Sequence, residues 1–240
     1  MKYSIIIPAH NEEMFIGKCL DSIKRSQQVA CAEIEVIVVL NRCNDGTEAI
    51  ARRYGVTVAE ENSKNLSRIR NRGAVLASGD IIVTIDADSC MSANMLSEID
   101  KKLATGRYIG GGVRILPERK SPGIRATMLV LNIGMFLSGL SGGLYWCRRE
   151  DFEAVGGFRE SLLIAEDLDF ARRLKAFGRR RKLKFALLKS AHIVTSCRKF
   201  DRFGDWFALK LLFFKGRQIL HGLQGKDHSL ANWLFYDFDR

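Results

Sequence analysis

Short runs of apolar residues alternate with amphipathic segments along the first half of the chain. Residues 3–8, 35–40 and 81–86 are mainly apolar and rich in β-branched side chains, a pattern typical of strands that are buried on both faces. Residues 12–28 place apolar side chains on one face of a helix, and residues 67–78 predict a second helix that ends at a glycine. Strands and helices in this order form βαβ units, which predicts an α/β fold.

The second half of the chain continues with shorter elements. Helices are predicted at residues 45–54, 92–105 and 166–177, and strands at 56–58, 108–116, 144–147, 183–188 and 192–195. The chain has 240 residues, enough for one large α/β domain with a substantial core. We therefore expect a single domain over residues 1–200, followed by an amphipathic helical extension over residues 201–240.

Two carboxylates, Asp86 and Asp88, follow the apolar run that begins at Ile81. In open α/β sheets, ligands bind in the crevice at the carboxyl ends of the strands. Alternate residues of an extended segment point the same way, so both carboxylates can face one small volume. A divalent metal that carries phosphate oxygens would relieve their repulsion. The alternative is that these residues only open a turn.

Three further segments accompany this acidic pair in a defined order. Residues 4–13 predict a strand, a proline and a helix start with Asn11 as N-cap. Residues 41–47 follow the second predicted strand, and residues 165–169 open a helix with acidic side chains. Together these motifs resemble the family 2 glycosyltransferases, an inverting group with the nucleotide-sugar-binding GT-A fold. The resemblance covers residues 3–200 and implies a Rossmann-like mixed, mostly parallel sheet flanked by helices.

The resemblance also implies roles for individual residues. It places Mg²⁺ or Mn²⁺ at Asp86 and Asp88, with Asp88 as the direct ligand. Asp167 is the expected catalytic base because the helix dipole keeps a carboxylate at a helix start ionised. Glu166 would orient this base, and Asp169 is the substitute candidate. Nucleotide contacts are expected from Pro8, Ala9, Asn11, Glu12, Asn41, Asp45, Arg72, Asp86 and Arg198.

Each of these residues also has a purely structural interpretation. Acidic residues at helix N-termini often serve only as caps, and Arg72 is one of three arginines on its helix. Leu40 and Asn41 stand where the family usually has two acidic residues, which leaves the nucleobase open. Trp146, after a glycine pair, could stack on an acceptor sugar or lie in the core.

The activity implied is transfer of one sugar from a nucleotide diphosphosugar to an acceptor hydroxyl on a glycan, a lipid-linked molecule or a small molecule. Metal-assisted inverting displacement is the expected mechanism of this hexosyltransferase-like enzyme. The Gln-x-x-Arg-Trp motif of processive synthases is absent. A sugar-nucleotide-binding protein or a nucleotidyltransferase-like protein remains as the alternative. A nucleotidyltransferase would carry a glycine-rich basic loop after the first strand, and a dehydrogenase would carry G-x-G-x-x-G there.

The net charge limits the classes of possible binding partner, and the cysteine content indicates the cellular compartment. With 38 Lys and Arg against 27 Asp and Glu, the net charge is +11. No nucleic-acid-binding motif accompanies this charge, so we expect a nucleotide diphosphate and an anionic membrane surface as partners, and no nucleic acid. Six scattered cysteines without a C-x-x-C pair, and a proline that interrupts the first apolar run, predict a cytoplasmic protein.

Two segments raise the question of membrane contact. Residues 126–147 carry no charge and are long enough to span a bilayer. They contain four glycines and separate two acidic motifs that the resemblance brings into one pocket, so we predict a buried or interfacial helix and then a strand. Residues 203–223 interleave Lys and Arg with Phe, Leu and Trp. This pattern is compatible with peripheral attachment to the inner membrane face, or with packing on the domain.

Overall fold

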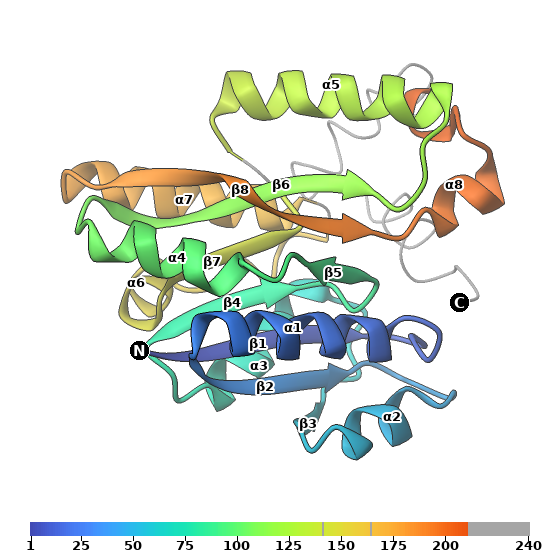
Figure 1. Cartoon of the computed structure of the whole chain (residues 1–240), viewed down its shortest axis with the longest axis horizontal. Coiled ribbons are helices and arrows are strands. Elements are labelled where there is room, and N and C mark those ends of the chain that lie inside the picture. Colours follow the sequence, from blue (N-terminus) through green and yellow to red (C-terminus); the bar gives the residue numbers. More distant parts are fainter. Residues whose placement is uncertain (141, 164, 211–240) are drawn as a thin grey trace.

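A computed structural model describes residues 1–140, 142–163 and 165–210 of the chain. Its centre is a sheet of eight strands in the order β3-β2-β1-β4-β7-β6-β8-β5. The strands are β1 (Lys2–Ala9), β2 (Glu33–Leu40), β3 (Thr57–Glu60), β4 (Ile81–Ile85), β5 (Ser89–Met91), β6 (Tyr108–Pro117), β7 (Leu144–Arg148) and β8 (Lys184–Thr195). The α/β fold with helices on both faces of the sheet confirms the prediction (Figure 1).

The first half of the sheet consists of parallel strands joined by helices. Strand β1 pairs in parallel with β2 and β4, and β2 pairs in parallel with β3. The connecting helices are α1 (Ile16–Ala30), α2 (Thr47–Arg53) and α3 (Leu66–Leu76). Because parallel strands end at the same edge, the carboxyl ends of β1, β2 and β4 lie side by side.

Apolar side chains of β1 fill cores on both sides of the sheet. Ile5 and Ile7 pack with α1 and with α4 (Met95–Ala104), whereas Ile6 packs with α3, α6 (Arg149–Ala154) and α7 (Glu166–Arg180). Figure 1 shows α1 and α4 in front of the sheet and α3 and α7 behind it. Burial on both faces explains why the strand is an uninterrupted apolar run rather than an alternating one.

The second half of the sheet is mixed. Strand β7 runs antiparallel to β4 and β6, whereas β8 runs parallel to β6. Strand β8 is one strand with an irregularity between Leu188 and His192, where two separate strands were predicted. The short strand β5 was not predicted, and it pairs antiparallel with the end of β8. This pairing brings residues 195–198 next to the acidic pair that follows β4.

Several predicted helix starts differ from the structure, and α4 begins at Met95 rather than at residue 92. Helix α1 begins at Ile16 rather than near residue 12, because Asn11 has a left-handed φ of 51° and its side chain accepts a hydrogen bond from Asn44 instead of capping. Helix α3 is capped by Asn65, whose side chain accepts from the backbone N–H of Arg68. Ser67, the first residue of the helix predicted at 67–78, lies inside α3 and donates to the carbonyl of Arg159.

Most of the uncharged span lies in helix α5 (Pro122–Ser138) and in β7, which confirms the predicted order of a helix and then a strand. The helix is not buried as a whole, because residues 129–134 are exposed. Among the described residues, no helix combines the length and apolar character needed to cross a bilayer. Helix α8 (Arg198–Phe203) follows β8. The predicted amphipathic segment 203–223 lies mostly outside the described residues, which end at Lys210. The division into residues 1–200 and 201–240 stays a prediction.

Candidate active site

A pocket opens at the edge of the sheet where β1, β2 and β4 end. Three parts of the chain line it: the ends of these strands, the start of α3, and the start of α8. The lining residues are Pro8, Ala9, His10, Glu12, Asn41, Leu66, Ile69, Asp86, Ala87, Asp88, Arg198 and Lys199. Six of the predicted nucleotide ligands and both predicted metal ligands are therefore brought together.

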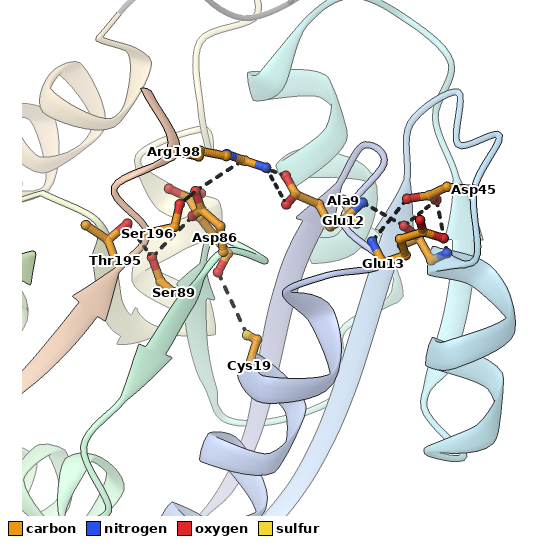
Figure 2. A network of polar contacts seen from close by, with 12 residues as sticks. Ala9, Glu12, Glu13, Cys19, Asp45, Asp86, Ser89, Thr195, Ser196 and Arg198 are labelled. Carbon is orange, nitrogen blue, oxygen red and sulfur yellow. Dashed lines mark hydrogen bonds and ion pairs between the residues drawn. The ribbon is translucent and has the colours of Figure 1, made fainter. Parts of the chain in front are cut away.

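Arg198 crosslinks the two acidic sides of this pocket. Its guanidinium donates to both carboxylate oxygens of Glu12, each at 2.8 Å, and lies 3.1 Å from Asp88 Oδ2 (Figure 2). Ser196 also donates to Asp88 Oδ2, at 2.8 Å. Burial disfavours the charged guanidinium, but the bond to Glu12 and the charge of Asp88 outweigh it and raise the pKa of Arg198. The β5–β8 pairing fixes this contact.

Arg70 makes a second crosslink deeper in the protein. Its two terminal nitrogens lie 2.8 Å from Asp86 Oδ1 and 2.7 Å from Glu166 Oε1. The Arg70 and Glu166 side chains are 7% and 8% exposed, whereas that of Asp86 is 42% exposed. Arg70 therefore ties the end of β4 to the start of α7, and leaves Asp86 facing the pocket.

The acidic start of α7 is short of positive charge. Burial raises the pKa of Glu166 to about 7, although the nearby Arg70 opposes that shift. Burial raises the pKa of Asp167 as well, again against Arg70, and the charge of Asp86 adds to the rise. Burial is thus the main reason that the pKa values of Glu166 and Asp167 are raised, and Arg70 alone does not offset it.

Asp167 borders the glycine pair before β7. Its Oδ1 accepts a hydrogen bond from the backbone N–H of Leu168 at 2.7 Å. A Cβ atom added to Gly142 would lie 3.6 Å from Asp167 Oδ2. The absence of a side chain at Gly142 therefore leaves open space on one side of the carboxylate. The backbone before the helix is shaped by Ala165, which has a left-handed φ of 55°.

Some predicted ligands lie outside the pocket lining. Asp45 caps the start of α2: its Oδ1 accepts from the backbone and hydroxyl of Thr47, and its Oδ2 accepts from the N–H of Glu13 (Figure 2). Asn11 holds the backbone of Asn44, and Arg72 is exposed on α3. None of these three lines the pocket.

His10 and Arg70 are among the lining or bridging residues that were not predicted as ligands. His10 lines the pocket, with Nδ1 2.5 Å from the carbonyl oxygen of Asn41. Arg70 was recognised only as one of three arginines on its helix. A helical-face argument would have singled it out, since Arg70 shares the buried face of α3 with Ile69 and Gly73. Trp146 is fully buried, so its position favours the core interpretation over sugar stacking.

The sequence model described as "Glycosyl transferase family 2" matches residues 4–156, well over half of the chain. The chain belongs to this family. Glycosyltransferase AglE of Haloferax volcanii is 26% identical over 252 residues, covering 98% of this chain and 80% of the relative. EpsJ of Bacillus subtilis, an uncharacterized glycosyltransferase, is 32% identical over 104 residues, covering 41% of this chain but only 29% of that protein.

Solved glycosyltransferase structures show the same fold. Staphylococcus aureus TarS 1–349 in complex with UDP-GlcNAc superposes with a TM-score of 0.64 at 19% identity, over 82% of this chain and 58% of that one. The Pyrobaculum calidifontis mannosyltransferase PcManGT with GDP-Man and Mn²⁺ gives 0.67 at 22% identity, over 96% and 71%. At these identities the likeness shows the GT-A fold, while the family match shows that the chain is a glycosyltransferase.

Proposed function

We propose that this protein transfers a single sugar from a nucleotide diphosphosugar to an acceptor hydroxyl, with inversion at the anomeric carbon. The observation that carries the proposal is a set of three carboxylates: two line the pocket, and the third, at the start of α7, is near enough for the charge of Asp86 to help raise its pKa. Asp86 and Asp88 follow β4 at the donor side, and Asp167 opens α7 beside the glycine pair. Leaving-group stabilisation and proton removal need separate groups, and this arrangement supplies both.

The nucleotide part of the donor fits the ends of β1 and β2. Pro8, Ala9 and Asn41 form this wall of the pocket. The Asn41 side chain is buried, and its amide donates to the carbonyl of Ser63 at 2.8 Å. We assign Asn41 to shaping the pocket, because its amide already holds the loop after β3. TarS with UDP-GlcNAc and PcManGT with GDP-Man make UDP- and GDP-sugars the first donors to test.

The acidic pair fits a Mg²⁺ or Mn²⁺ ion. Such ions prefer oxygen ligands and typically bind one or two carboxylates, with substrate phosphates and water completing the shell. Within the described part of the chain, no group of three or more candidate ligands occurs, which matches a shell completed by substrate. Asp86 and Asp88 would hold the ion, and Arg198 would remain beside Asp88. When bound, the ion supplies charge stabilisation for the departing diphosphate.

Asp167 is the best placed general base. Its raised pKa makes it a stronger proton acceptor than an ordinary aspartate, and Gly142 leaves room beside it for an acceptor hydroxyl. In the proposed step, the acceptor oxygen attacks the anomeric carbon and the bond to the diphosphate breaks. The hydroxyl proton passes to Asp167. Glu166 is held by Arg70 and therefore positions the start of α7.

The decisive variant is Asp167→Asn, which keeps the size of the side chain and removes the proton acceptor. Turnover should fall by about 10²–10⁴-fold, while donor affinity and thermal stability change little. Asp169→Asn is the matched control on the same helix, because Asp169 pairs with Arg159 and Arg173 instead of the pocket. Near-normal turnover of Asp167→Asn would refute the assignment, and a selective loss in Asp169→Asn would move the base there.

Donor binding and product analysis test the rest of the proposal. Calorimetric titration with UDP, GDP and their sugars should show affinity that depends on Mn²⁺ and collapses in Asp88→Ala. Equal binding in EDTA would contradict the metal assignment. Release of a nucleoside diphosphate identifies glycosyl transfer, whereas release of pyrophosphate would identify a nucleotidyltransferase. The anomeric configuration of the product, read by NMR, decides between inversion and retention.

A further inference from the structure

The middle of helix α5 exposes large apolar side chains to solvent. Ile124 and Thr127 in its first turns are buried. From residue 129 to residue 134 every position is exposed, and six consecutive residues go fully around a helix. The large apolar side chains in this stretch are Leu129, Val130, Leu131 and Ile133, between 44% and 61% exposed. Soluble monomers rarely expose contiguous apolar surface of this kind without a binding role.

The charge around this helix has one sign. Residues 119–149 contain no Asp or Glu. Lys120 and Arg125 are exposed at the amino end of α5. At the carboxyl end, Lys175 of α7 donates to the carbonyl oxygens of Ser138 and Gly139. The exposed Arg179 lies near enough to help lower the pKa of Lys175, after the larger effect of burial.

Two acidic side chains near α5 are paired with one arginine. Asp201 and Asp205 lie by the amino end of the helix, and both pair with Arg119, at 2.6 and 2.7 Å. The backbone of Asp205 also packs against Gly123. The exposed Trp206 follows directly and is 50% exposed. Figure 1 shows α5 and α8 at the same margin of the molecule, with α5 as the outermost element beyond β6.

We infer that α5 docks the protein on an anionic membrane surface. Its exposed apolar residues would enter the interface between headgroups and acyl chains, while the exposed Lys120 and Arg125 at one end and Arg179 at the other meet lipid phosphates. A second copy would need acidic groups opposite both ends of the helix, whereas residues 119–149 of this chain contain no Asp or Glu, and Asp201 and Asp205 are paired with Arg119. An anionic bilayer supplies that charge everywhere.

The docking would orient the active site. Helix α5 leads through Leu140 to Gly142, beside Asp167 Oδ2. The acceptor side of the pocket is therefore the side joined to the docking helix. This inference does not depend on the proposed transfer reaction, because membrane binding is measured without donor or acceptor.

The test is co-sedimentation of the full chain with vesicles of phosphatidylcholine alone and with 30 mol% phosphatidylglycerol added, roughly the anionic content that gives strong surface potentials. The variant Leu129→Gln/Leu131→Gln/Ile133→Gln should weaken binding at least about tenfold. Lys120→Gln/Arg125→Gln should weaken it about fivefold for each cation. The matched control is Val75→Gln, an apolar residue that is 75% exposed on α3, and it should bind as the parent does. Circular dichroism and melting curves show that each variant folds.

Three results would overturn the inference. Binding that ignores lipid charge, or that survives the triple substitution, removes α5 as the docking element. Binding lost only when Phe213 and Phe214 are substituted assigns the contact to the segment beyond the described residues. The third result would be that the parent binds no lipid, and that the triple substitution changes the molar mass measured by light scattering. In that case α5 would be a contact between copies of the chain.

Discussion

Arg70 carries the most specific energetic prediction. Its guanidinium is nearly buried between Asp86 and Glu166 and stacks 5.3 Å from the ring centre of Phe158. Arg70→Met keeps the length and apolar contact of the side chain and removes its charge. Removing one partner of a buried ion pair costs about 3–5 kcal/mol, because the remaining charge is left uncompensated in the interior. Glu166 would carry most of this cost, since Asp86 reaches solvent.

The cost should depend on pH in a defined direction. Burial already raises the pKa of Glu166 to about 7 in the folded protein, against about 4.3 in an unfolded chain. Loss of Arg70 raises the folded-state pKa further. A carboxyl group whose pKa is raised by folding loses stability as the pH increases through that range. We therefore expect Arg70→Met to lower the free energy of unfolding by about 3 kcal/mol at pH 8. The loss should be smaller at pH 5, where Glu166 can take up a proton.

Urea denaturation at pH 5 and pH 8 measures both effects. Arg68→Met is the control on the same helix, because Arg68 is 55% exposed and its ion pair with Glu160 lies at the surface; it should cost no more than about 1 kcal/mol. Adding Glu166→Gln to Arg70→Met should restore part of the stability at pH 8. The reasoning fails if Arg70→Met costs no more than Arg68→Met, or if its deficit is the same at both pH values.

Two further predictions concern the frame of the sheet. Burial alone would raise the pKa of Glu35, but its hydrogen bonds outweigh that effect and lower the pKa to about 2. Glu35→Gln should therefore lower the free energy of unfolding by about 2 kcal/mol at pH 7, allowing for solvent screening. This loss should vanish as the pH falls from about 4.3 toward 2. A deficit that does not change with pH would show that charge is irrelevant there. A Cβ at Gly111 would lie 2.8 Å from Trp146 Cζ2, so Gly111→Ala should cost about 1–3 kcal/mol. Gly134→Ala, which meets no atom within 4 Å, should not lower the melting temperature, and equal effects of the two would refute the packing argument.

The fold class and the acidic pair could be predicted from the sequence because their causes are local. A strand buried on both faces must be a continuous apolar run, and a helix on the sheet must repeat apolar positions at its own period. The carboxyl end of such a strand is where Asp86 and Asp88 stand. The resemblance to the family named Pro8, Ala9 and Asn41 as nucleotide contacts, and parallel packing of β1 and β2 brings them to the same edge of the sheet.

The tertiary structure alone decided which polar residues meet. Strand β5 has only three residues, too few for a periodic signal, yet its pairing with β8 brings Arg198 to Glu12, across 186 positions of sequence. Asn11 failed as a helix cap because a loop hydrogen bond to a distant backbone outweighed its local preference. Sequence patterns thus determined the strands, their burial and the carboxylates at their ends. Of the three arginines on α3, only the tertiary structure shows that Arg70 contacts Asp86 and Glu166. A buried charge needs a partner of opposite charge, and here the partners come from other elements of the chain.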